Sequence, residues 1–250
     1  MKTIFLTEYG RRRAALKDGG LKRRGDAAED DVLQDVRRGL HSPPIMRRPH
    51  LWELSDMSAI IRYLTHPQVH VDPDTPVPDW RLSVEGVERV EAAAALPAFQ
   101  GTVAIISSAE RKARETAAPL AAALGLDVTV RAAMHENDRS ATGFLPPPEF
   151  EATADAFFAR PQDSVRGWER AADAQARIVR EAEAALTEAS DGDVLFVGHG
   201  AVGTLLYCAW AGLAIDRRHD QTGGGGQVWA ASRAEKTPLY AWRMLEDEAG

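Results

Sequence analysis

The sequence predicts an α/β protein with three layers, α/β/α, in which helices cover both faces of a mostly parallel central sheet. From Met57 onward, short apolar runs alternate with longer amphipathic segments, the pattern of strands that are connected through helices. The run 193–198 then stops at Gly198-His199-Gly200, and a helix-like segment follows at once. Ligands bind at the carboxyl ends of such strands, so His199 is expected beside a ligand.

The order of the expected elements follows from periodicity and from helix start and stop signals. A first strand at 59–64 ends just before His66, and Ser83 caps a helix that Pro97 closes. Further strands are expected at 103–107, 127–131 and 193–198, and helices at 84–96, 109–124, 147–160, 165–189 and 201–212. Two short strands, 228–232 and 239–244, are expected to form a hairpin at the sheet edge.

Residues 1–56 differ in kind from the rest of the chain. They hold 12 Lys and Arg residues against nine acidic ones and show little periodic apolar pattern. We predict that 1–56 form a poorly ordered basic extension and that 57–250 form the folded domain. Two origins of the extension stay open: translation could truly begin at Met57, which the composition favours, or the segment could be a genuine flexible arm.

Composition limits the classes of partner. A net charge of -7 over 250 residues argues against nucleic-acid binding, which needs clustered Lys and Arg, and favours a small molecule. No run approaches the roughly 18 apolar residues of a membrane span, so no membrane partner is expected. Cys208, the single cysteine, cannot form an internal disulfide, and a cytoplasmic location is expected. The sequence carries no signal for an oligomeric state.

Four short motifs follow one another along the predicted domain. They are LTHP at 64–67, LSVEG at 82–86, SAERKARETA at 108–117 and GHG at 198–200. In this order they resemble the motifs of the histidine phosphatase superfamily, also called phosphoglycerate mutase-like, over roughly residues 59 to 245. The resemblance implies a phosphoglycerate mutase-like fold.

The resemblance also implies roles for individual residues. His66 matches the histidine that accepts the phosphoryl group, His199 matches the second histidine, and Glu136 matches the loop carboxylate. Lys112 takes the position of the family's second pocket arginine. A lysine is a point charge and does not reproduce the two parallel bonds that a guanidinium makes to phosphate.

The residues on either side of the first histidine depart from the family pattern. Thr65 replaces an arginine and Pro67 replaces a glycine, so the pocket carries less fixed positive charge. An arginine from elsewhere could complete it, the candidates being Arg62, Arg81, Arg111, Arg114 and Arg139. Arg139 is the first candidate, because its loop also holds Glu136.

The implied chemistry is metal-free phosphoryl transfer. A neutral imidazole of His66 can attack phosphorus and form phosphohistidine, and His199 and Lys112 can stabilise the charge of the transferring group, with Thr65 beside them. Glu136 would protonate the leaving oxygen and later take a proton from water. We therefore predict a phosphomonoester hydrolase, needing no metal or cofactor, for small or a broad range of phosphorylated molecules.

Plainer interpretations stay open. Each histidine could be a hydrogen-bonded structural residue, Glu136 could be solvated or cap a helix, and Lys112 could be exposed on its helix. The missing arginine favours a second hypothesis, a weak or inactive relative that only binds a phosphorylated ligand or a partner. Within the family, a phosphoglycerate mutase is the other alternative. Last, the run 223–226 is expected to form a flexible turn, and His219 and Asp220 before it could line the pocket, although a surface loop is the better interpretation.

Overall fold

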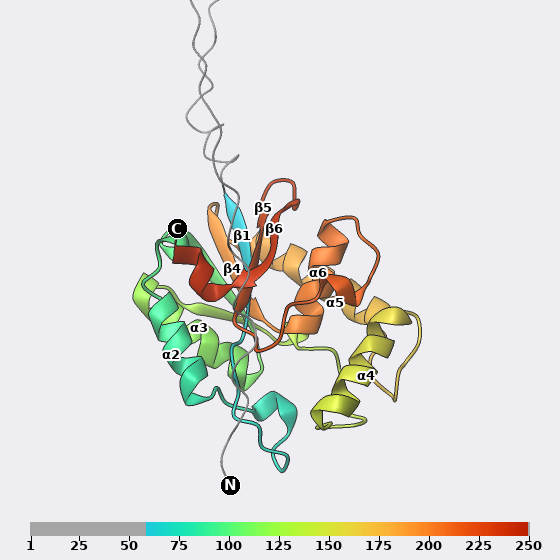
Figure 1. Ribbon diagram of the computed structural model, residues 1–250. Helices are drawn as coiled ribbons and strands as arrows, with labels where there is room; N and C mark the ends of the chain where they lie inside the picture. The colour runs from blue at the N-terminus through green and yellow to red at the C-terminus, as the bar shows by residue number, and fades with distance from the viewer. Residues whose placement is uncertain (1–58, 250) are drawn as a thin grey trace, which may run out of the picture. The chain divides into compact units, whose positions relative to one another are not determined.

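A central sheet with helices on both faces forms the part of the chain that the computed structural model describes, residues 59–249 (Figure 1). The strand order is β3-β2-β4-β1-β5-β6. The bounds are β1 Ile60–Thr65, β2 Thr102–Ser108, β3 Val128–Arg131, β4 Asp193–Gly198, β5 Gln227–Ser232 and β6 Pro238–Met244. The predicted extension 1–56 lies outside the described residues, and so does the boundary at residue 57.

The sheet is mostly parallel, as predicted. β1 pairs in parallel with β4, and β2 pairs in parallel with both β3 and β4. β5 runs antiparallel to β1 and to β6, so the predicted hairpin forms one edge of the sheet. The expected α/β/α fold class is confirmed.

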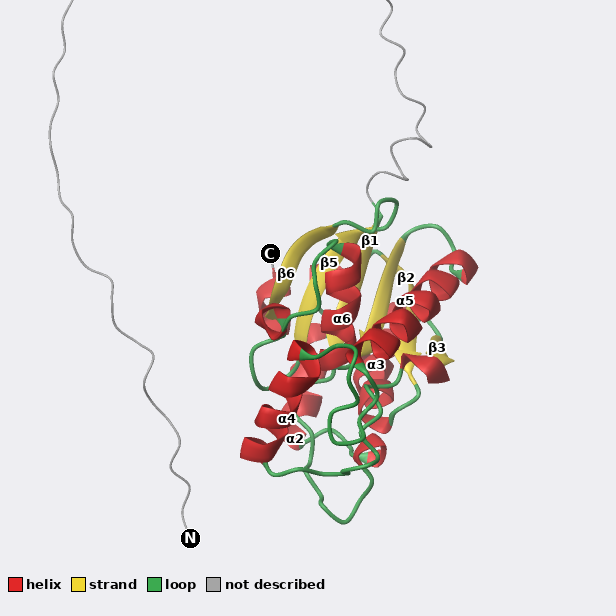
Figure 2. Cartoon of the chain, turned by 90° about the vertical axis from the view of Figure 1, so that its right-hand side faces the viewer, coloured by secondary structure: helices red, strands yellow, loops and turns green. Residues whose placement is uncertain are grey.

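Two pairs of helices cover the two faces of the sheet (Figures 1 and 2). One pair is α2 Val84–Ala93 and α3 Arg111–Leu124, and the other is α5 Ala171–Glu188 and α6 Gly200–Trp210. A fifth helix, α4 Pro147–Ala159, packs in the same hydrophobic core as the second pair. Successive side chains of a strand point to opposite faces, so Tyr63 packs in the core beneath α5 and α6, whereas Leu64 packs in the core beneath α2 and α3. None of the described helices is long and apolar enough to cross a membrane.

Two helices are shorter than the sequence predicts. α2 ends at Ala93, and Leu96 is extended because a residue before proline avoids the helical region, here before Pro97. α5 begins at Ala171 and not at residue 165, since Arg166 and Gly167 have positive φ values of 54° and 83°, which no helix accommodates.

Three neighbouring strands run in the same direction, so their carboxyl ends lie together along one edge of the sheet, a different edge from the one that the hairpin forms. β2, β4 and β1 lie side by side in parallel, and their carboxyl ends lead to Ser108, His199 and His66 respectively. The topology therefore brings together residues that are far apart in the sequence, at the position where α/β sheets bind ligands.

Candidate active site

The backbone of His66, just after the end of β1, is fixed by hydrogen bonds to β4 on one side and to the glycine run before β5 on the other. Its N–H donates to the carbonyl of Gly198 (3.0 Å), and its own carbonyl accepts from the N–H of Gly226 (3.0 Å). A Cβ at Gly225 would lie 2.3 Å from the His66 carbonyl oxygen, so only glycine fits there, at φ +65°. The glycine run, predicted to be a flexible turn, therefore packs against the backbone of His66.

The ring of His66 carries its proton on a defined nitrogen. Nδ1 lies 2.9 Å from the Pro67 carbonyl oxygen, and a carbonyl only accepts, so Nδ1 is the protonated nitrogen and Nε2 keeps its lone pair. Burial, together with the charge of Lys112, lowers the pKa of His66 from 6.5 to about 4. The ring is neutral at pH 7.

His199 is fixed through Tyr63. The fully buried Tyr63 hydroxyl accepts from the N–H of His199 (3.2 Å), and a Cβ at Gly198 would lie 2.3 Å from that hydroxyl. The ring centroid of His199 is 5.4 Å from that of His66. Its Nε2 lies 2.8 Å from the Ser108 hydroxyl, and its buried Nδ1 has no hydrogen-bond partner among the described residues. Burial also holds the pKa of His199 well below 6.5.

Glu136 lies at the amino end of α6. Its carboxylate accepts from the backbone N–H groups of Val202 (3.1 Å) and Asn137 (3.0 Å), so it does cap a helix, one of the plainer roles left open by the sequence. Burial is the largest influence on the Glu136 carboxyl and raises its pKa, although the charge of Arg139 opposes the shift. Helix capping and a carboxyl of raised pKa coexist in this residue.

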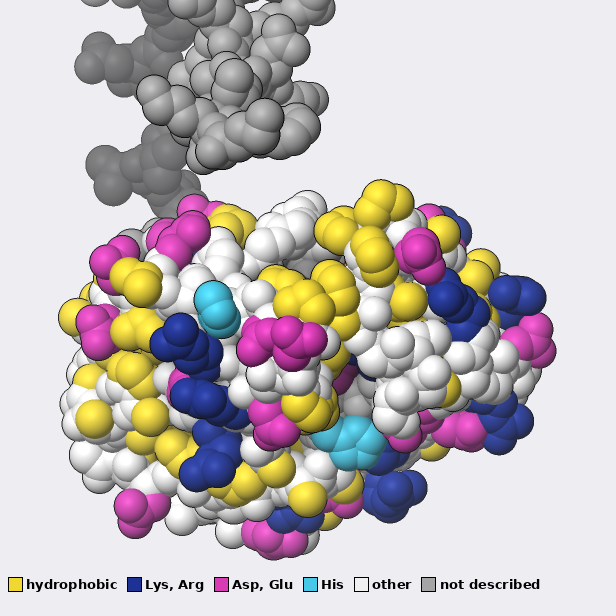
Figure 3. All heavy atoms as spheres, turned by 90° about the horizontal axis from the view of Figure 1, so that it is seen from below, with side chains coloured by type: hydrophobic (Ala, Val, Ile, Leu, Met, Phe, Trp, Pro, Cys, Tyr) yellow, Lys and Arg dark blue, Asp and Glu magenta, His cyan; other side chains and the backbone are white. Residues whose placement is uncertain are grey.

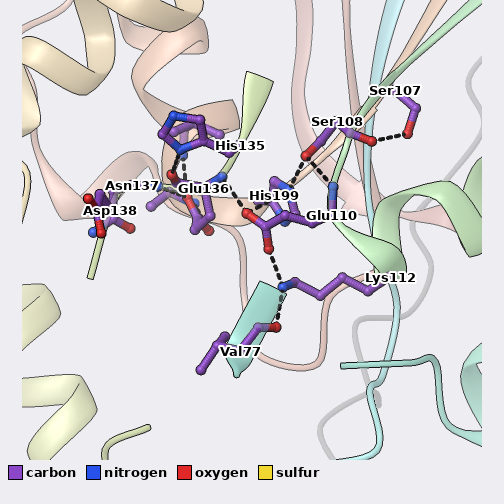
Figure 4. Close-up of polar contacts among 12 residues, drawn as sticks. Val77, Ser107, Ser108, Glu110, Lys112, His135, Glu136, Asn137, Asp138 and His199 are labelled. Carbon is purple, nitrogen blue, oxygen red and sulfur yellow. Dashed lines mark hydrogen bonds and ion pairs between the residues drawn. The ribbon is translucent and has the colours of Figure 1, made fainter. Parts of the chain in front are cut away.

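Lys112 is buried and not exposed on its helix, with 2% of its side chain accessible. Its ammonium donates to the Val77 carbonyl (2.9 Å) and to the carboxylate of Glu110 (Figure 4). Glu110, which sequence reasoning passed over, thus neutralises the lysine in the position of the family's second arginine. The only sequence signal for it was an acid two residues before Lys112.

Thr65 is fully buried, and its hydroxyl is occupied by other protein groups. It donates to Gln221 Oε1 (2.7 Å) and accepts from the N–H of Gln227 (3.0 Å). Gln221 and Asp220 line the cavity that holds His66, so for Asp220 the pocket-lining alternative holds rather than a simple surface loop. Burial raises the pKa of the Asp220 carboxyl, which accepts from the hydroxyl of Thr204 (2.8 Å).

Arg139 is the arginine, among the five candidates, that lines the cavities beside the site. It borders three of them, of about 270, 480 and 320 Å³, and its guanidinium lies 5.1 Å from the ring centroid of Phe150. By contrast, Arg62 pairs with Asp193, and Arg111 pairs with Glu115. Acidic, basic and histidine side chains gather around the hollow on this face (Figure 3).

The structure therefore brings His66, His199, Glu136, Lys112 and Arg139 to one edge of the sheet. Among residues 59–249, no three His, Cys, Asp or Glu side chains form a group that could hold a metal ion. A neutral imidazole with a free lone pair beside a buried carboxyl is an arrangement that can carry out nucleophilic and acid–base chemistry.

Comparisons with solved structures give the same fold. The chain superposes on the mycobacterial glucosyl-3-phosphoglycerate phosphatase with a TM-score of 0.59 and 21% identity, covering 74% of this chain and 96% of that one. For Bacillus stearothermophilus YhfR the TM-score is 0.60, with 18% identity and coverage of 74% and 96%. For the alpha-ribazole phosphatase of Shigella flexneri they are 0.55, 17%, and 76% and 97%.

The sequence itself matches a family model. No curated protein compared with the chain is significantly similar to it. The model of the histidine phosphatase superfamily (branch 1) matches residues 70–229, more than half of the chain, and this span holds Lys112, Glu136 and His199 while beginning just after His66. The resemblance found in the motifs is therefore confirmed, and the chain belongs to branch 1 of the histidine phosphatase superfamily.

Proposed function

We propose that the chain is a phosphomonoester hydrolase that works through a phosphohistidine intermediate on His66. The hydrogen bond between His66 Nδ1 and the Pro67 carbonyl carries the proposal, because it leaves the Nε2 lone pair for attack on phosphorus. The nearby ring of His199 and membership of the superfamily support the same reaction.

Two balanced steps account for turnover. In the first, His66 Nε2 bonds to phosphorus as the bond to the leaving oxygen breaks, and Glu136 gives its proton to that oxygen. In the second, the oxygen of water bonds to phosphorus as the bond to His66 Nε2 breaks, the proton of the water passes to Glu136, and inorganic phosphate leaves. The raised pKa of Glu136 supports this role, since it favours the protonated acid before the first step.

Charge on the transferring group needs hydrogen-bond donors that are already in place. His199 Nδ1 is unpartnered among the described residues, and Arg139 borders the cavity that holds His66. Lys112 has one N–H left, since the Val77 carbonyl and Glu110 take the other two. We assign these groups to the phosphate site, and none of the proposed steps uses a metal.

The cavities beside Arg139 give room for the leaving group. The cavity of about 270 Å³ has mainly apolar walls, formed by Val77, Trp80, Phe144, Leu145, Pro147 and Phe150. The cavity of about 480 Å³ is bordered by Glu110, Glu136 and other polar residues. These volumes suit small ligands. The substrates we propose are small phosphate esters, in which the leaving alcohol is either polar or apolar.

The test is release of p-nitrophenol from p-nitrophenyl phosphate by the full chain with EDTA present. His66→Ala is compared with His70→Ala, an exposed histidine four residues away. We expect activity that survives EDTA and the control substitution, and that falls by about 10³-fold or more in His66→Ala. Activity that EDTA abolishes, or that His66→Ala retains, contradicts the proposal.

A second function, binding of a phosphorylated ligand without turnover, is favoured by one observation. The two family arginines are represented by Thr65, whose hydroxyl is occupied, and by Lys112, whose charge is balanced by Glu110. Calorimetric binding of phosphorylated sugars, nucleotides and glycerates by a chain that hydrolyses none of them would establish this function. Transfer of the phosphoryl group between hydroxyls of glycerate would instead indicate a mutase.

A further inference from the structure

The Glu110 carboxylate is held by donors of the kind that bind a phosphoryl oxygen. Its Oε2 accepts from the ammonium of Lys112, while its Oε1 accepts from the N–H of Glu136 (2.9 Å) and lies 3.5 Å from His199 Nε2 (Figure 4). A cation and a backbone N–H are common phosphate ligands. Only 9% of the Glu110 side chain is accessible, so the carboxylate lies inside the site.

Glu110 is an anion in the absence of a ligand. Burial opposes its charge, but with His199 neutral the ammonium of Lys112 and the N–H of Glu136 still favour the carboxylate and lower the pKa of Glu110. The protein therefore places its own anion against Lys112, one of the groups assigned above to the phosphate site.

The other charged groups nearby do not cancel this anion for an incoming ligand. Lys112 is already paired with Glu110. The rings of His66 and His199 are neutral, and Glu136 adds a second carboxyl. The 3-10 turn Val77–Asp79 packs against α3, and the contact it makes there is the Val77 carbonyl, which accepts from the ammonium of Lys112. Arg139 is the remaining fixed cation bordering the cavities. A phosphoryl dianion that approached His66 would meet a carboxylate within the same set of donors, and like charges this close strongly disfavour each other.

We propose that Glu110 is a specificity-determining residue: a phosphoryl group binds beside it only with one proton shared between a phosphoryl oxygen and the Glu110 carboxylate. The proton comes from solvent, and no covalent bond changes. A phosphate monoester takes up its second proton near pH 6, so this proton is available at little cost near neutrality. The site thus selects the monoanion over the dianion. This inference rests on the proposed function only for the position of the phosphoryl group.

The test is calorimetric titration of the full chain with inorganic phosphate near pH 8, in two buffers that differ in their heat of ionisation. The difference between the two heats counts the protons taken up. Glu110→Gln removes the charge and keeps the shape, and Glu136→Gln is the matched control, since it removes the other buried carboxyl of the site. Glu110→Ala and thermal unfolding of every variant guard against a loss of fold.

We expect the native chain and Glu136→Gln to take up about one proton for each phosphate bound, since a dianion and a carboxylate this close must share one. Glu110→Gln and Glu110→Ala take up almost none and bind phosphate about tenfold or more tightly. Proton uptake that persists without Glu110, affinity that does not rise, or absence of phosphate binding in every folded variant overturns the inference. Because binding is measured without turnover, a chain that binds as described and hydrolyses nothing refutes the proposed function alone.

Discussion

Two pairs of side chains meet at the carboxyl edge of the sheet, and their charges are balanced in different ways. His66 and His199 stand at the ends of the adjacent strands β1 and β4, and both rings are neutral because burial lowers their pKa. Lys112 and Glu110 stand at the start of α3, and both are charged and buried against each other. The histidine pair has open nitrogens, whereas the lysine–glutamate pair is largely satisfied internally.

The difference separates the proposed nucleophile from the charges proposed to bind phosphate. The nucleophile needs only a backbone acceptor and burial, which the strand end provides at Pro67. Binding of a negatively charged phosphoryl group needs cations that are free to pair with the substrate. Lys112 is already paired with a protein group. The histidine pair is therefore expected to control the chemical step, and the lysine–glutamate pair to control affinity and stability.

Glu136→Gln is expected to give the largest effect, because it removes the acid that we propose serves the histidine pair. For glycerol phosphate, whose alkoxide needs a proton, kcat/KM, which reports the steps up to release of the alcohol and not the later attack by water, should fall by about 10²–10⁴-fold. For p-nitrophenyl phosphate the fall should be much smaller, since nitrophenolate leaves without one. Kinetics on both esters check this, and equal losses on the two would remove Glu136 from the role of acid.

Lys112→Met should cost about 3–5 kcal/mol of unfolding free energy, because it leaves the Glu110 carboxylate buried and unpaired. Adding Glu110→Gln should restore most of that loss, since the double variant buries no uncompensated charge. Urea unfolding of the two singles and the double completes the cycle. A double variant as unstable as Lys112→Met would show that the two charges do not act as a pair.

The histidine pair should make stability depend on pH in a defined window. His66 has a native pKa of about 4, against 6.5 for the ordinary value, so between these limits the unfolded chain binds a proton that the native chain does not. The contribution of His66 to the free energy of unfolding is fully present above pH 6.5 and is lost as the pH falls toward about 4. The lowered pKa of His199 acts in the same direction. The midpoint of urea unfolding should therefore fall as the pH is lowered through this window. The fall should be less steep in His66→Asn than in His70→Asn. In the kinetics, kcat/KM should fall below about pH 4 as His66 is protonated.

Gly225→Ala should have the smallest of these effects, about 1–3 kcal/mol, because it puts a Cβ against the His66 carbonyl at a positive φ. Turnover should fall with it, since His66 must shift. Gly223 has open space around it and no positive φ, so Gly223→Ala is the matched control and should change neither property. Thermal unfolding and kcat of the two variants compare them directly, and a Gly225→Ala protein indistinguishable from Gly223→Ala would show that the turn does not position His66.

Much of this fold follows from the sequence. Apolar runs of strand length that alternate with amphipathic segments predicted the parallel sheet, and they placed His66 and His199 at strand ends on one edge. The shorter α5 was missed, because the positive φ values at Arg166 and Gly167 break a segment whose composition still favours a helix.

The balance of charge in the site was beyond sequence reasoning. Glu110 occupies the N-cap position before the first residue of α3, where Ser, Thr, Asp or Asn is the usual cap, and its side chain makes no capping bond but turns into the site. The partner of Thr65 is Gln221, 156 residues away, and no local pattern announces such a contact. Contacts of this kind depend on how the loops pack after the sheet has formed.

The most direct test of the account is to find the phosphoryl group on the enzyme. The full chain is mixed with p-nitrophenyl phosphate, quenched in alkali because phosphohistidine is labile in acid, and digested for peptide mass spectrometry. The account predicts one phosphoryl group on His66, present in the native chain and absent from His66→Asn. Turnover with no phosphoryl group on His66, or with the group on His199 or Ser108, would contradict it.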